Sequence, residues 1–227
     1  MEHKLIYLAR RNPALRADAF PQAWREHSAF ASTFGQSFRK YFKGSCQMVR
    51  IWTPDLPESF SNIYDGSALL TMVSREGLLA ARYQPGTTDA LKKDEERVFA
   101  SYVDDWTMNA EEYLVAGEEK GEFAILSFLF PTVSIDSGFW DASRTRVEAL
   151  AASSTVAAAS CIAGNKVVDP SRAHGFGAMI EIWFADLETA TRAAHDSALV
   201  TALEQADIAD PSQGARLLAR RNPRSAA

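Results

Sequence analysis

The chain has 227 residues, of which 47% are hydrophobic and 11% aromatic, and its formal net charge is −5. That much apolar material can build one large domain or two small ones, so a largely disordered chain is excluded. Acidic and basic residues are interspersed and leave no basic face, so we expect no nucleic-acid partner.

No stretch approaches the roughly 18 apolar residues that a membrane-spanning helix needs, and residues 1–4 lack the apolar run of a signal peptide. We therefore expect a cytoplasmic protein with no membrane partner. The two cysteines, Cys46 and Cys161, are too few for a disulfide framework, so we predict buried free thiols. The histidines are scattered along the chain, so no metal site is predicted.

The first half of the chain predicts the order strand, helix, strand, strand, helix, strand. Residues 4–9 form a short apolar strand, and a helix begins near Asp18, a plausible N-cap, and ends at Gly35. Apolar residues recur along this helix at three- and four-residue steps, so one face should pack on a sheet. The other predicted elements are a strand within residues 38–52, a strand at 67–73, a helical region at 75–101 interrupted near residues 85–86, and a strand at 106–116.

After a polar junction bounded by Gly117 and Gly121, the second half repeats this order. Strands are expected at residues 122–130, 156–168, 177–184 and 215–220, and helices at 137–152 and 187–206. We interpret the repeat as an internal duplication of one small domain, with a first copy at residues 1–117 and a second, degenerate copy at residues 121–227.

This element order is that of a ferredoxin-like βαββαβ unit, an antiparallel sheet with both helices on one face. The other face must be covered, and two such sheets can cover each other. We therefore predict an α+β fold in which two ferredoxin-like repeats pack face to face as an intramolecular dimeric α/β barrel, with a cavity between the sheets.

Several segments carry a family likeness in their order and spacing. They are residues 5–13, Phe20 with Trp24-Arg25-Glu26-His27, residues 39–41, residues 64–66, residues 94–99 and residues 179–188. Together they resemble the EthD family of the dimeric α/β-barrel superfamily. In that family the histidine often follows the tryptophan by four residues, whereas His27 follows Trp24 by three; the second copy has Arg146 at the position of His27.

His27 is the main candidate for catalysis, because an imidazole can take and return a proton near neutral pH. A histidine packed on the apolar helix face is the alternative. Tyr41 could hydrogen-bond a substrate oxygen. Asp65 could orient His27 or act as a second base, although a turn role in Asp-Gly is also open. His174, in a loop, and His195, on a helix, are expected to face solvent.

Aromatic side chains could form the walls of a site for a flat hydrophobic ligand, or simply fill a sheet core. The candidates for substrate binding are Trp24, Phe30, Tyr64, Trp106 and Trp183. The sequence has no glycine-rich phosphate loop and no Gly-x-Ser-x-Gly motif. We therefore expect no cofactor.

Our leading hypothesis is a cofactor-independent lyase or isomerase, such as a dehydratase or cyclase. It would act by proton transfer on a small hydrophobic oxygenated ring compound, in secondary metabolism or in aromatic or xenobiotic degradation. The resemblance implies a similar range, since the superfamily also includes cofactor-free monooxygenases. The alternatives are a cofactor-free or haem-dependent oxidoreductase of the same superfamily and a non-catalytic small-molecule-binding accessory protein. For the haem-dependent alternative, the resemblance to the superfamily implies an axial histidine in the second half, and His195 is the helical candidate. A homodimer of the whole chain also stays open.

Overall fold

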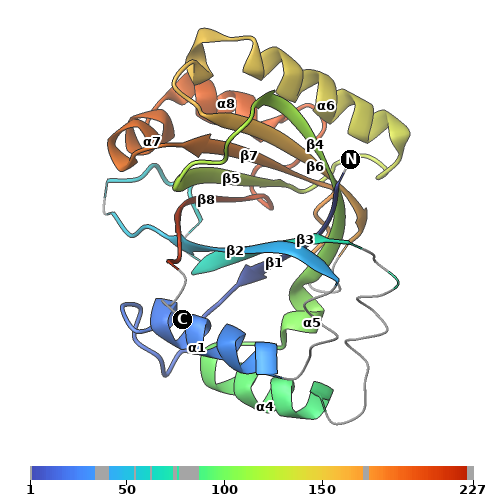
Figure 1. Cartoon of the computed structure of the whole chain (residues 1–227). Helices are drawn as coiled ribbons and strands as arrows, with labels where there is room; N and C mark the ends of the chain where they lie inside the picture. Colours follow the sequence, from blue (N-terminus) through green and yellow to red (C-terminus); the bar gives the residue numbers. More distant parts are fainter. Residues whose placement is uncertain are drawn as a thin grey trace.

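A computed structural model describes residues 2–33, 41–53, 55–61, 63–73, 76, 87–170 and 174–223. In this part of the chain, eight antiparallel strands close into one barrel (Figure 1). The strands are β1 (Glu2–Ala9), β2 (Phe42–Arg50), β3 (Gly66–Met72), β4 (Thr107–Gly117), β5 (Phe123–Leu129), β6 (Cys161–Asp169), β7 (Ala178–Phe184) and β8 (Ala215–Arg221).

The barrel consists of two sheets with the same internal order. The first runs β4-β1-β3-β2 and the second β8-β5-β7-β6, which is the order of a ferredoxin-like unit in each half. Two seams join the sheets. Residues 48–50 of β2 pair with residues 219–221 of β8, whereas β4 pairs with β6 along residues 109–117 and 161–169. The predicted α+β fold, two duplicated repeats forming one barrel, is confirmed.

Helices cover the outside of both sheets (Figure 1). They are α1 (Phe20–Thr33), α4 (Thr87–Val98) and the short α5 (Val103–Trp106) in the first half, and α6 (Ser137–Ala151), α7 (Leu187–Ala194) and α8 (Ser197–Glu204) in the second. Successive residues of a strand point to opposite faces. Along β1, Ile6 and Leu8 belong to the core inside the barrel, whereas Tyr7 and Ala9 pack under α1.

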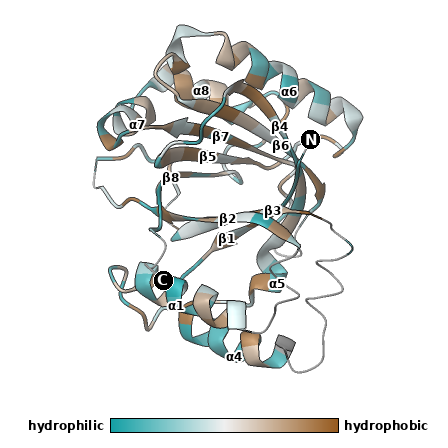
Figure 2. Cartoon of the chain, viewed as in Figure 1, coloured by the Kyte–Doolittle hydropathy of each residue, from teal (hydrophilic) through white to brown (hydrophobic). Residues whose placement is uncertain are grey.

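The inside of the barrel is filled by side chains. Ile6, Leu126, Met179 and Leu217, from four different strands, are each no more than 1% exposed and belong to one apolar cluster. Figure 2 shows hydrophobic residues along the strands and mixed colours on the helices. The cavity that we expected between the sheets is therefore occupied by packed side chains, as is usual for a closed eight-stranded barrel.

Element boundaries differ from the prediction at three places. The helix expected at residues 187–206 is two helices, because the side chain of Asp196 caps α8 by accepting from the N–H groups of Ala198 and Leu199. The strand expected from residue 156 begins at Cys161, since Val156 lies in a short 3₁₀ helix, Ser154–Val156. Trp106 ends α5 instead of starting a strand. Residues 77–86 of the predicted helical region lie outside the described residues.

Both cysteines are free, as predicted; Cys161 is buried, whereas Cys46 is only partly buried. In the described part of the chain, no helix is both long and apolar enough to cross a membrane.

Candidate functional site

His27 lies outside the barrel, between two helices. Its Nδ1 atom is 2.8 Å from Oδ2 of Asp94 on α4, and its ring meets Phe99 edge-on at 5.3 Å. Burial lowers the pKa of His27, and the hydrogen bond with Asp94 partly opposes that effect. The expectation that His27 faces a chamber between the sheets is not met, because α1 packs on the outer face of its sheet.

Asp65 and Tyr41 also lie apart from the barrel interior. Asp65 accepts a hydrogen bond from the backbone N–H of Arg11 at 2.9 Å and pairs with the Nε atom of Arg11 at 3.2 Å. The carboxylate that holds His27 therefore comes from Asp94, and the sequence reasoning missed it. Tyr41 packs beside Leu5 and Met72, at the start of β2.

The five aromatic residues predicted to bind substrate fall into three places. Trp24 is fully buried under α1, where its Nε1 donates to the hydroxyl of Tyr7 at 3.0 Å. Phe30 is 37% exposed on the same helix. Trp183 lies inside the barrel. Tyr64 and Trp106 come together at one end of the barrel.

His174 and Phe176 lie at the same end of the barrel as Tyr64 and Trp106. We call the group of these four rings the aromatic mouth. Ring centroids are 5.9 Å apart for Tyr64 and Trp106, 4.5 Å for Trp106 and His174, and 4.9 Å for His174 and Phe176. These residues precede the first residues of β3, β4 and β7, which the antiparallel order brings to the same end. The duplication thus builds one site from both halves.

The aromatic mouth holds a neutral imidazole and a neutral phenol. Burial lowers the pKa of His174 to about 4 and raises the pKa of Tyr64, which the nearby charge of Arg10 partly opposes. Nδ1 of His174 is 3.5 Å from the hydroxyl of Tyr64. At neutral pH, His174 can therefore accept a proton and Tyr64 can donate a hydrogen bond. The prediction that His174 faces solvent was wrong, because its ring is partly buried against Tyr64, Trp106 and Phe176.

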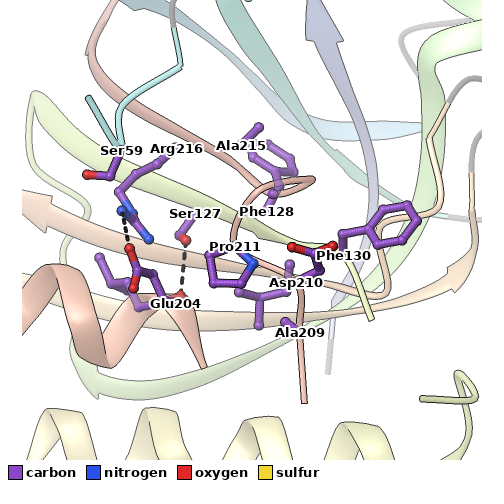
Figure 3. A pocket seen from close by; sticks show the side chains of 13 residues that line it. Ser59, Ser127, Phe128, Phe130, Glu204, Ala209, Asp210, Pro211, Ala215 and Arg216 are labelled. Carbon is purple, nitrogen blue, oxygen red and sulfur yellow. Dashed lines mark hydrogen bonds and ion pairs between the residues drawn. The ribbon is translucent and has the colours of Figure 1, made fainter. Parts of the chain in front are cut away.

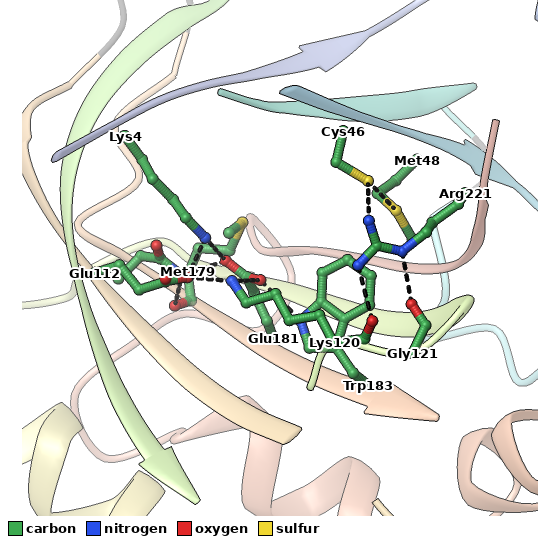
Figure 4. Close-up of polar contacts among 11 residues, drawn as sticks. Lys4, Cys46, Met48, Glu112, Lys120, Gly121, Met179, Glu181, Trp183 and Arg221 are labelled. Carbon is green, nitrogen blue, oxygen red and sulfur yellow. Dashed lines mark hydrogen bonds and ion pairs between the residues drawn. The ribbon is translucent and has the colours of Figure 1, made fainter. Parts of the chain in front are cut away.

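The other end of the barrel contains buried charges, which we call the ion cluster: Lys4, Glu112, Lys120 and Glu181 (Figure 4). Lys4 and Lys120 both contact both carboxylates. Glu181 is 0% exposed and accepts from Lys4 at 2.5 Å and from Lys120 at 3.0 Å. The indole N–H of Trp183 donates to the same carboxylate at 2.8 Å.

The ion cluster is suited to holding the two halves together and poorly suited to proton transfer. Burial alone would raise the pKa of Glu181, but the charges and hydrogen bonds of Lys4 and Lys120 hold it well below its usual range. The same carboxylates raise the pKa of Lys120 against the effect of burial. Glu181 and Lys120 therefore stay ionised and paired with each other near pH 7. The aromatic mouth is therefore the better candidate site.

A closed barrel built from two ferredoxin-like repeats defines the class of the protein, a duplicated dimeric α/β barrel. No protein-family model and no curated protein matches the sequence, so the EthD resemblance is not confirmed.

Solved structures share this fold. An anthrone oxidase-like protein has a TM-score of 0.69 at 9% identity, covering 97% of this chain and 91% of that one. A proposed chlorite dismutase has a TM-score of 0.56 at 7% identity, covering 97% and 95%. A proposed monooxygenase from Fusobacterium nucleatum subsp. nucleatum has a TM-score of 0.54 at 8% identity, covering 98% and 93%. At these identities the likeness establishes the fold.

The residues of the second half do not fit the haem ligand that we considered. His195 is exposed at the C-terminal end of α7. The layer beneath α7 and α8 is filled by buried aliphatic residues such as Ile180, Leu199 and Leu218. Among the described residues, no three His, Cys, Asp or Glu side chains come together in a way that could hold a metal ion.

Proposed function

We propose that the protein is an oxidoreductase that uses no resident cofactor and oxidises a small, flat, oxygenated aromatic compound at the aromatic mouth. The observation that carries this proposal is the neutral pair of His174 and Tyr64, whose rings lie in edge-to-face contact with Trp106, while His174 also stacks on Phe176. The fold shared with an anthrone oxidase-like protein and a proposed monooxygenase supports an oxidative reaction.

The chemistry begins with a proton transfer. Trp106, which is only partly buried, has an aromatic ring against which a flat substrate can pack, and the buried ring of Phe176 supports His174 from behind. His174 accepts a proton from an acidic C–H group of the substrate, and Tyr64 donates a hydrogen bond to the oxyanion that develops. Such an electron-rich anion can react with molecular oxygen directly. For a methylene carbon the balance is R₂CH₂ + O₂ → R₂C=O + H₂O, in which the substrate is the reductant and oxygen the oxidant.

The lyase or isomerase that we first considered would share this first proton transfer and then proceed without oxygen. Oxygen dependence therefore distinguishes the two proposals. Two of the structures with the same fold are described as a proposed monooxygenase and an anthrone oxidase-like protein, and this favours the oxidoreductase over the lyase or isomerase.

The test measures oxygen uptake by the purified protein with anthrone and with 1,4-dihydroxynaphthalene as probes, corrected for uncatalysed oxidation. We expect His174→Gln to lower kcat/KM by about 100-fold or more, and Tyr64→Phe by at least about tenfold. His195→Gln is the matched control, because that histidine is exposed on the outside, and it should retain full activity.

Four outcomes would contradict the proposal. Equal turnover with and without oxygen would indicate a lyase or isomerase. Full oxygen uptake by His174→Gln would show that the reaction takes place at another site. Loss of activity in His27→Gln alone would assign the chemistry to the pair of His27 and Asp94, as the sequence first indicated. Saturable quenching of tryptophan fluorescence by the probes without any turnover would indicate a binding protein.

A further inference from the structure

A concave region lies away from the aromatic mouth, between the start of β8, the end of β5 and the C-terminal end of α8 (Figure 3). Its cavity volume is about 30 Å³. The polar side chains that line it are Ser59, Ser127, Glu204, Asp210 and Arg216. This is room for a ligand group of a few atoms, not for an aromatic ring system.

Arg216 is the unusual member of this pocket. Its side chain is only 6% exposed, and its Nε atom has no hydrogen-bond partner among the residues that the structure describes. Its ion pair with Glu204 is long, at 3.9 Å between Nη1 and Oε1. Phe60 lies at 5.7 Å from the guanidinium carbon and supplies no charge. A buried guanidinium is costly unless it is paired and hydrogen-bonded.

The acidic groups of the pocket do not satisfy this cation. Glu204 is 28% exposed at the end of α8, so its pair with Arg216 is partly in water and contributes little. Both carboxylate oxygens of Asp210 are engaged in their own turn, where they accept from Ser212 and Gln213. Burial lowers the pKa of Arg216 despite the charge of Glu204.

The pocket lies beside the C-terminal end of α8. Gln205, directly after Glu204, is the C-cap of this helix and adopts a left-handed conformation with φ 46° and ψ 45°. A left-handed residue commonly ends a helix, although glycine is the usual residue there. Residues 203–204 precede Gln205 and residues 209–211 follow it, and both segments line the pocket.

We propose that this pocket is a binding site for a small carboxylate group, held by Arg216 in competition with Glu204. The guanidinium presents a fixed fork of donors that matches the two oxygens of a carboxylate. The ligand would take the place that Glu204 now occupies incompletely, while the hydroxyls of Ser59 and Ser127 lie in the same lining. This proposal uses no residue of the aromatic mouth and is independent of the proposed reaction.

Binding is measured by isothermal titration calorimetry with acetate as the probe, at constant ionic strength kept with chloride. A ligand of four heavy atoms at a single arginine should bind with a dissociation constant in the millimolar range. Glu204→Gln removes the internal competitor without changing its shape, and we expect it to bind acetate at least about fivefold more tightly. Arg216→Met should abolish binding.

Arg146→Met is the matched control. Arg146 also pairs with a carboxylate, that of Asp207, but on the surface of α6, and its loss should leave acetate binding unchanged. Unchanged or weaker binding to Glu204→Gln would overturn the proposal, and so would equal binding to Arg216→Met, which would mean adventitious binding only. If Arg216→Met does not fold, the direction of the change in Glu204→Gln still decides.

Discussion

His174 shows how much a single side chain depends on contacts that are distant in sequence. It stands in the loop before β7, where a polar residue ordinarily faces water. In the structure its ring is enclosed by Tyr64 and Trp106, both from the other half of the chain. Their chemistry made Tyr64 and Trp106 candidates for ligand binding, and that role stays a prediction. Their contact with His174 could not be predicted, because no local sequence pattern encodes a contact between the two repeats.

The buried state of His174 predicts a specific dependence of stability on pH. Its pKa in the folded protein is about 4, below the value of about 6.5 in an unfolded chain, so the unfolded chain takes up the proton first on acidification. The free energy of unfolding should therefore fall as pH decreases from about 6.5 to about 4, and be unaffected by His174 above that range. At this half-buried position we expect a loss on the order of 1–2 kcal/mol.

Urea unfolding of the wild type and of His174→Phe at pH 7.0 and at pH 4.5 measures this effect. The variant keeps an aromatic ring in the aromatic mouth but cannot bind the proton, so its stability should fall less on acidification. His27, whose pKa is also lowered, remains in both proteins and cancels in the comparison. Parallel losses of stability in the two proteins would show that His174 is not held neutral.

At the scale of helices and strands, apolar runs located most strands to within a few residues, because buried strands are short and bounded by polar turns. The face that each residue occupies was harder to predict. All seven residues of β7 are buried, since one face packs inside the barrel and the other under the helices. The apolar stripe of α1, with Trp24 and His27, was predicted to pack on its sheet, and Trp24 does pack there. Because the helices cover the outer face, this placement keeps His27 out of the barrel interior, which the prediction of a chamber around His27 overlooked.

The break between α7 and α8 gives a prediction at this scale. Asp196 caps α8 with two backbone hydrogen bonds, so Asp196→Ala should destabilise the protein by about 1 kcal/mol. Asp196→Asn keeps an oxygen that can accept these bonds, and should cost clearly less. Urea unfolding at pH 7 measures both variants. Equal stability of Asp196→Ala and the wild type would mean that packing of Leu199 and Leu203 alone sets the start of α8.

At the scale of the whole molecule, the two repeats share one interior. Cores inside the barrel combine residues from both halves, and the ion cluster joins Lys4 and Glu112 to Lys120 and Glu181. The duplication itself was visible in the sequence as a repeated order of elements. The ion cluster could not be predicted from the sequence, because a single Lys or Glu residue gives no sign of its partner on another sheet.

Because each half leaves its inner face uncovered, we expect residues 1–117 and residues 121–227 to be poorly folded when they are produced separately. Mixed together, they should form a 1:1 complex that unfolds in one cooperative transition. Size-exclusion chromatography and circular dichroism measure association and folding. Two fragments that each stay monomeric and unfold cooperatively would show that the repeats are independent domains.

The two seams that close the barrel, β4–β6 and β2–β8, differ in length. In a twofold-symmetric pair of identical subunits, the two seams between the sheets must be the same. Fusion into one polypeptide removes that requirement. Here the β4–β6 seam is the longer one, whereas the β2–β8 seam pairs residues 48–50 with residues 219–221 and continues with one backbone hydrogen bond on each side, from Ile51 to Leu218 and from Asn222 to Gln47. We therefore expect the β4–β6 seam to stay paired while the β2–β8 seam opens more readily. The backbone amides of the β2–β8 seam should exchange with deuterium first.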